Sequence, residues 1–163
     1  MRFFVSIMLS DEMKEAITNK MHELKKNGVR GNYTPMQNLH LVIALTDEIK
    51  DSDMVRDALQ TLKYKPFRLS LTDFGISGDS LWIGIKGNQG LNSLARDVRE
   101  LLDKAGVGNN KEKFEPHITI IQKCTGNWKA VASPKVEMMV KRVTLIKPEM
   151  KDGKRVFKEV DSF

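Results

Sequence analysis

Two histidines, His40 and His117, each open a short apolar segment of the chain. Each segment is predicted to be a β-strand, in which residues two apart point to the same face. His40 therefore shares a face with Val42, and His117 shares one with Thr119. Imidazole titrates near neutral pH, so two facing histidines can remove one proton and deliver another. Such a pair suits the hydrolysis of a phosphodiester, with the Thr119 hydroxyl and the nearby Lys123 stabilising charge on the phosphoryl oxygens.

The remaining residues with reactive or stacking side chains are less informative. His22 lies within a predicted helix, where we expect it to have no catalytic role. Cys124 falls on the opposite strand face from His117, which argues against a cysteine–histidine nucleophile. Trp82 could stack on a nucleobase, although packing is the favoured interpretation for an alternating strand. Three scattered histidines and one cysteine lack the spacing of a zinc site, and no phosphate-binding glycine loop is present. We therefore expect neither a metal nor a cofactor.

The elements that must position the two histidines follow from hydrophobic periodicity. A strand over 3–9, a helix with apolar residues at helical spacing from Met13 to Leu24, and a strand over 39–45 form one unit. A strand over 81–86, a helix over 91–105 and a strand within 114–122 form a second unit of the same pattern. Packed around a pseudo-twofold axis, the two units would place the histidines across a cleft, although other strand pairings are equally compatible with the sequence.

The other segments complete a mixture of helices and strands. The stretch 31–35 is rich in turn residues, and Asp51 or Ser52 can cap a second helix that ends near Leu62. Alternating apolar residues predict a hairpin between 67–72 and 81–86, with its turn at 75–79. Two further strands, 140–146 and 155–160, are separated by a segment with the composition of a turn, 147–154.

Length and composition set broad limits on the protein. A chain of 163 residues with 40% hydrophobic and 29% charged residues predicts one globular domain spanning 1–163. The formal net charge of +6 and pI near 9.4 favour an anionic partner such as nucleic acid. The apolar run at the N-terminus is short and lacks a cleavage site, so a buried first strand is expected. No segment is long enough to span a membrane, and with a lone cysteine these features favour a cytoplasmic location.

The histidine segments and their flanks resemble the two-histidine (2H) phosphoesterase superfamily, whose mark is a pair of His-x-Thr motifs. More closely, the chain is similar to the RNA 2′,3′-cyclic phosphodiesterases, also called 2′-5′ RNA ligase-like proteins. The resemblance rests on the opening strand 1–7, the first motif with its lead-in at 38–41, the strand 81–85, the full second motif at 114–120 and the closing residues 143–157.

This resemblance implies a bilobal α+β fold, in which two pseudo-symmetric lobes with antiparallel sheets line a central cleft and helices lie on the outside. It also implies metal-independent hydrolysis of RNA 2′,3′-cyclic phosphate ends to 2′-phosphates. His40 would be the general acid that protonates the leaving 3′ oxygen, His117 the general base that activates water, and Thr119 a ligand of the phosphate. RNA ends or nucleotide-like cyclic phosphates are the expected partners, and the protein is expected to be a monomer.

Two positions depart from the family pattern. Val42 stands where the first motif has threonine or serine, and Gln122 stands where relatives often carry arginine, although Lys123 could compensate. One missing hydrogen bond to a charged transition state costs roughly 1.5–3 kcal/mol. These departures leave open a slower enzyme, an altered substrate, or a catalytically weak RNA-end-binding module on the same fold. An ATP-independent 2′-5′ RNA ligase also stays open, because joining is the reverse of diester cleavage and uses the same residues.

Overall fold

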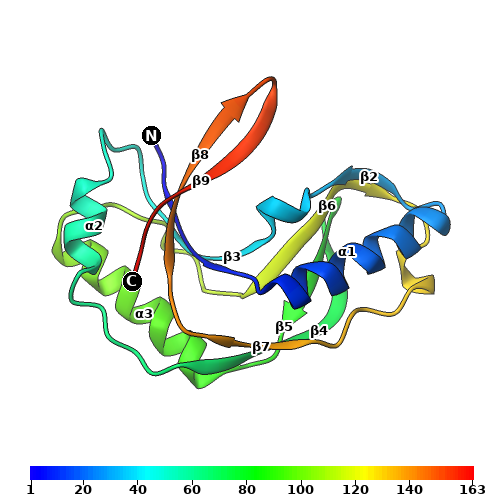
Figure 1. The fold of residues 1–163 in the computed structure, drawn as a ribbon, viewed down its shortest axis with the longest axis horizontal. Helices are drawn as coiled ribbons and strands as arrows, with labels where there is room; N and C mark the ends of the chain where they lie inside the picture. The colour runs from blue at the N-terminus through cyan, green and yellow to red at the C-terminus, as the bar shows by residue number, and fades with distance from the viewer.

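The computed structural model describes residues 1–163 as two antiparallel sheets with three α-helices (Figure 1). The four-stranded sheet has the order β3 (His40–Leu45), β1 (Phe4–Met8), β8 (Thr144–Lys151) and β9 (Lys154–Ser162). The five-stranded sheet has the order β2 (Arg30–Tyr33), β6 (His117–Thr125), β5 (Ser80–Ile85), β4 (Phe67–Ser77) and β7 (Glu137–Val140). The expected bilobal α+β fold is confirmed, and β3 and β6, the two histidine strands, belong to different sheets.

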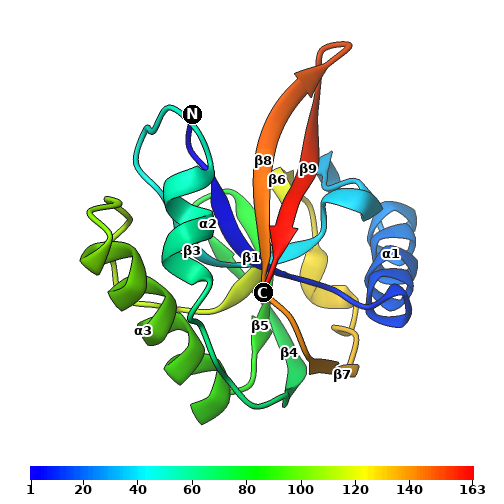
Figure 2. The same cartoon turned by 60° about the vertical axis from the view of Figure 1, so that its left-hand side comes forward.

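Each long helix begins at a capping side chain. Each also follows a strand of one sheet in the chain but packs beside elements of the other sheet. The Ser10 hydroxyl accepts from the backbone N–H of Met13 at the start of α1 (Asp11–Lys26), and Asn88 caps α3 (Gln89–Lys104) in the same way. α1 follows β1 of the four-stranded sheet but lies beside the five-stranded sheet (Figures 1 and 2). α3 follows β5 of the five-stranded sheet but packs against β3 and α2 (Asp53–Leu59). This exchange of helices ties the two sheets together.

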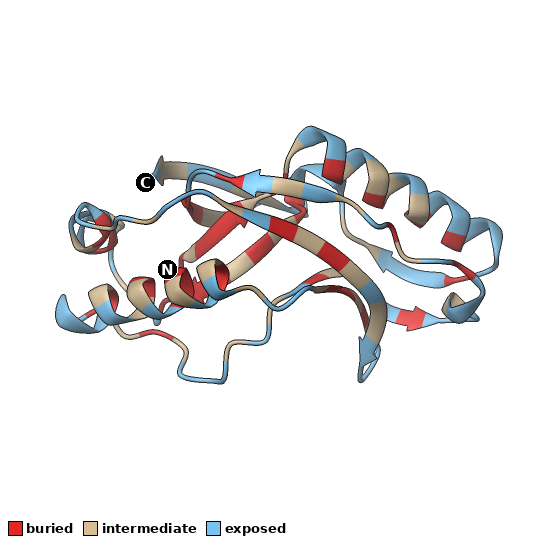
Figure 3. Cartoon of the chain, turned by 90° about the horizontal axis from the view of Figure 1, so that it is seen from below, coloured by how far each residue is buried: buried red, intermediate tan, exposed pale blue.

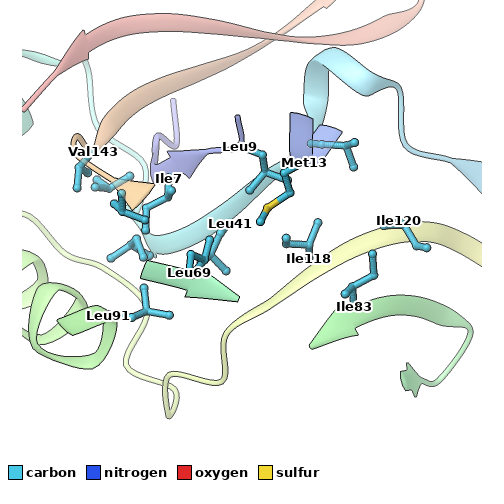
Figure 4. Packing of buried hydrophobic residues seen from close by; sticks show 14 of the residues in the cluster. Ile7, Leu9, Met13, Leu41, Leu69, Ile83, Leu91, Ile118, Ile120 and Val143 are labelled. Carbon is cyan, nitrogen blue, oxygen red and sulfur yellow. The ribbon is translucent and has the colours of Figure 1, made fainter. Parts of the chain in front are cut away.

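A continuous cluster of 33 buried residues fills the space between the sheets and the inner faces of the helices (Figure 3). Figure 4 shows members from both sheets, with Leu41 on β3 and Ile118 on β6. Both of these side chains are fully buried, and so are Ile43 and Ile120, the next residues on the same strand faces. The histidine strands are thus anchored through one face, which leaves the opposite face for the cleft.

The expected turn at 31–35 is wrong, and the expected turn at 75–79 is too long. Residues Arg30–Tyr33 form the edge strand β2, which pairs with β6. β4 continues to Ser77, and only Gly78 and Asp79 separate it from β5. Gly75 is a strand residue that pairs with Trp82 on β5. It is glycine because the Trp82 indole lies over it and leaves no room for a Cβ atom. Glycine here permits close packing on the sheet, and the sequence offered no way to distinguish this from a turn.

The C-terminal strands also differ from expectation. The predicted strand 140–146 is two strands, since β7 pairs with β4 in one sheet and β8 pairs with β1 in the other. The segment 147–154 is almost entirely strand, and the hairpin turn is only Asp152 and Gly153. Pro148 is tolerated because β8 pairs with β1 only over Thr144–Ile146, so beyond that point β8 has one neighbour, β9.

None of the helices combines the length and apolar character needed to cross a membrane.

Candidate active site

His40 is the first residue of β3 and is partly buried. Its Nδ1 is 3.0 Å from the hydroxyl of Ser6 on β1. Its ring packs against Phe4 and Phe157, with ring centroids 5.4 and 4.8 Å away. Burial, and secondarily the positive charge of Arg155, lower the pKa of His40 from 6.5 to about 4. In the free protein at neutral pH, His40 is therefore an uncharged imidazole.

His117 is the first residue of β6 and is exposed to solvent. Its Nδ1 is 2.7 Å from the backbone carbonyl oxygen of Glu115. A carbonyl oxygen can only accept, so Nδ1 must carry the hydrogen and donate it. The neutral ring then has its lone pair on Nε2, which is the tautomer that a general base requires. The Trp82 ring lies beside it, with centroids 5.8 Å apart.

The two histidine strands face a common cavity of about 370 Å³. Four predicted site residues line it: His40, Val42, His117 and Thr119. The cavity size falls in the range of small-ligand sites. The predicted convergence of both motifs on one cleft is thereby realised in the structure.

The second motif position differs between the two strands. Thr119 presents a hydroxyl to the cavity, and its backbone carbonyl oxygen accepts from the Thr34 hydroxyl at 3.2 Å. Val42 on β3 has only methyl groups in its side chain. Its pairing partner on β1 is Ser6, whose hydroxyl contacts His40. The cavity therefore has no hydroxyl at the second motif position of β3, and the buried Ser6 hydroxyl contacts the His40 imidazole instead.

Lys123, the fifth predicted site residue, does not line the cavity. It is exposed near the end of β6, with φ of 54°. The cations at the cavity are instead Arg99 on α3 and Lys113 in the segment before β6. Arg155 on β9 is close enough to His40 to lower its pKa.

Sequence reasoning missed Arg99, which links the two histidine strands. Its guanidinium donates to the backbone carbonyl oxygen of Glu112 at 2.8 Å and to that of Ile43 at 3.3 Å. Ile43 lies on β3 and Glu112 precedes β6, so one side chain fixes both sides of the cavity. Nothing in the sequence near either histidine identifies Arg99. Ser6 did leave a signal, because it is a polar residue inside the apolar run of the first strand.

No group of three or more histidine, cysteine, aspartate or glutamate side chains is arranged to hold a metal ion.

The chain is similar to known proteins over most of its length. The family model of the 2′-5′ RNA ligase superfamily matches residues 13–152. The RNA 2′,3′-cyclic phosphodiesterase of Archaeoglobus fulgidus is 30% identical over 128 residues, covering 74% of this chain and 71% of that protein. The Thermotoga maritima protein of the same name is 28% identical over 129 residues, covering 74% and 68%.

Solved structures show the same fold. The crystal structure of E. coli LigT complexed with 3′-AMP has a TM-score of 0.83 at 24% identity, covering 99% of this chain and 96% of that chain. The apo form of LigT has a TM-score of 0.84 at 22% identity, covering 99% and 95%. With the family model spanning most of the chain, this protein belongs to the 2′-5′ RNA ligase superfamily of two-histidine phosphoesterases.

Proposed function

We propose that this protein is a metal-independent RNA 2′,3′-cyclic phosphodiesterase that converts a cyclic phosphate end to a 2′-phosphate. One observation carries the proposal: His40, His117 and Thr119 line a single cavity. The hydrogen bond from His117 Nδ1–H to Glu115, which leaves Nε2 free, supports it. The activity named for the Archaeoglobus and Thermotoga relatives supports it.

His117 acts as the general base. Its Nδ1–H is bound to the Glu115 carbonyl oxygen, so Nε2 takes a proton from water as the water oxygen attacks phosphorus. The Thr119 hydroxyl donates to a phosphoryl oxygen, where negative charge grows in the transition state. Exposure of His117 gives solvent water direct access to this nitrogen.

His40 acts as the general acid that protonates the leaving 3′ oxygen. Its lowered pKa means that it must gain a proton when substrate binds. The phosphodiester anion supplies the reason, since an adjacent negative charge favours the imidazolium. The Ser6 hydroxyl suits this cycle because it can donate to Nδ1 of the neutral ring or accept from Nδ1–H of the charged ring.

The test is the product formed from an RNA oligonucleotide that ends in a 2′,3′-cyclic phosphate, incubated in EDTA. Wild type should release a 2′-phosphate end. The variants His40→Ala and His117→Ala should each lose most turnover, while His22→Ala, an exposed histidine on α1, serves as the matched control.

Each other outcome points to a different conclusion. Equal activity in the wild type and both cleft variants would refute the assignment of the histidines. Binding without turnover would favour the RNA-end-binding module. A 2′-5′ linked product formed from two RNA ends without ATP would favour the ligase.

A further inference from the structure

A second hollow continues the cleft beyond the histidines. This basic groove, of about 1260 Å³, lies between the segment from Lys25 to Tyr33 and the tip of the β8–β9 hairpin. The hairpin projects from the body of the protein as the orange and red strands of Figures 1 and 2. Four cations line the groove, and no aspartate or glutamate does: Lys25, Arg30, Lys154 and Arg155.

The groove and the catalytic cavity are consecutive along the same two chain segments. On β6, Thr119 lines the cavity, and Gln122, three residues later, lines the groove. Before β3, Asn38 lines the groove, and His40, two residues later, lines the cavity. The reacting phosphate would therefore sit near the junction of the two hollows.

The two hollows differ in charge. In the cavity, Arg99 and Lys113 are balanced by Glu112 and Glu115, and Phe114 adds an aromatic ring. In the basic groove, none of the four cations forms an ion pair with a carboxylate of the protein. A balanced cavity with an aromatic ring suits a nucleoside. Cations on both walls of a groove that holds no carboxylate suit the phosphates of a nucleic-acid backbone.

One wall of the groove is fixed in place next to the catalytic site. The Asn38 side chain is buried, with 6% exposure, and its amide donates to the backbone carbonyl oxygen of Arg155 at 3.0 Å. The Arg155 guanidinium in turn lies over the rings of Phe4 and Phe157, which enclose His40. The hairpin that carries half of the cations is thus positioned by the segment that leads into β3.

We propose that the basic groove binds the backbone of an RNA strand on the 5′ side of the cyclic phosphate, and that the cavity binds the terminal nucleoside. This proposal rests on the proposed phosphodiesterase function and adds the orientation of the RNA strand in the cleft. In the terminal ribose, the base is attached to C1′, next to C2′. The 5′ chain is attached through C5′ to C4′, next to C3′. With the 2′,3′ edge at the histidines, base and chain extend in opposite directions along the cleft.

The experiment compares kcat/KM for a 2′,3′-cyclic mononucleotide and for oligonucleotides of two to six nucleotides with the same cyclic end. Wild type should prefer the longer substrates by at least ~10-fold, since each phosphate in the groove displaces counterions. The variant Arg30→Gln/Lys154→Gln should remove most of that preference. Arg155 is left intact because its charge also affects His40.

Two controls isolate the groove. Lys141→Gln/Arg142→Gln removes the same charge from the exposed β7–β8 connection and should preserve the preference for length. Phe114→Ala in the cavity should lower kcat/KM for mononucleotide and oligonucleotide by a similar factor, because both carry the terminal nucleoside. Equal kcat/KM at every length in the wild type would overturn the proposal, and so would a loss of preference in the control pair.

A binding measurement separates this proposal from the phosphodiesterase function. If no substrate is turned over, the proposed function fails, but a fluorescent hexanucleotide with a 3′-phosphate still reports on the groove. Arg30→Gln/Lys154→Gln should weaken its binding and reduce the slope of log K against log salt concentration by roughly 1.4, since two phosphate contacts are lost. Unchanged affinity and slope would overturn the groove assignment.

Discussion

The two histidine strands place the same side chain in opposite environments. On β3, His40 is enclosed by Phe4 and Phe157 and contacts the hydroxyl of Ser6. On β6, His117 is exposed, and the Glu115 carbonyl oxygen fixes its tautomer. Each histidine is nevertheless the first residue of its strand, and each strand contributes the residue two positions later to the cavity.

This difference shows how a pseudo-symmetric fold can support an asymmetric reaction. Two identical groups with identical surroundings would have no assigned roles. Burial lowers the pKa of His40, and the Glu115 carbonyl oxygen fixes the tautomer of His117, so the two rings are not equivalent. His40 can act as the acid only once the substrate's negative charge favours its protonated form.

The largest expected effect assigns the two roles through the leaving group. His117→Ala should lower kcat about 10²- to 10⁴-fold on RNA with a cyclic phosphate, and equally on a p-nitrophenyl phosphodiester, because both need an activated water. His40→Ala should lose as much on the RNA but recover to within about 10-fold of wild type on the p-nitrophenyl ester, whose leaving group needs no proton. Steady-state rates on both substrates measure this, and the reverse pattern would exchange the roles.

Burial of His40 should make stability depend on pH. Its folded pKa of about 4 lies below the unfolded value, so the unfolded state binds a proton first as pH falls. The free energy of unfolding should therefore fall by up to about 3 kcal/mol between pH 6.5 and 4. His40→Gln should lose this part of the slope in urea melts across the pH range, and His22→Gln on α1 is the control. An identical slope in wild type and His40→Gln would contradict the burial.

Exchanging the motif residues tests the missing hydroxyl. Thr119→Val should lower kcat roughly 10- to 100-fold, since it removes a donor worth about 1.5–3 kcal/mol to a charged transition state. Val42→Thr restores the family residue on β3 and should raise kcat by up to the same factor. Rates of both variants and of the double exchange measure the asymmetry. No gain from Val42→Thr would mean that another group already serves the phosphate on that side.

Most of the fold could be predicted from the sequence because its strands and helices follow simple hydrophobic patterns. The histidine strands, the long helices and the β4–β5 hairpin follow from periodicity and capping. The failures at Gly75 and Pro148 share one cause, which is tertiary context. Gly75 is a glycine inside a strand because the Trp82 ring of the paired strand lies on it, and Pro148 is tolerated because one edge of β8 is free there. Neither fact is local in sequence.

The site was predictable where it follows strand alternation and unpredictable where it depends on other elements. His40, Val42, His117 and Thr119 came from alternation on two strands. Arg99 lines the cavity from α3, and Arg155 on β9 acts on His40 through its charge, so no local pattern connects them to the histidines. Lys123 was chosen for its nearness in sequence, and it does not line the cavity, because a β-bulge in the β5–β6 pairing interrupts the alternation of β6 before that point.

The smallest predicted effect concerns Ser6, the only hydroxyl that contacts the His40 ring. Ser6→Ala should lower kcat about 5-fold with KM little changed, because a typical hydrogen bond contributes about 1 kcal/mol and this one orients the imidazole without touching substrate. Thr144→Val is a matched control: Thr144 lies opposite Ser6 on β8, is equally buried, and its hydroxyl has no hydrogen-bond partner. Rates for Ser6→Ala, Ser6→Thr and Thr144→Val, each with a melting curve, distinguish orientation from stability. A lower kcat in Ser6→Ala, with kcat recovered in Ser6→Thr and unchanged in Thr144→Val, would assign Ser6 to the positioning of His40. Equal kcat in all three variants would mean that the aromatic neighbours alone orient His40.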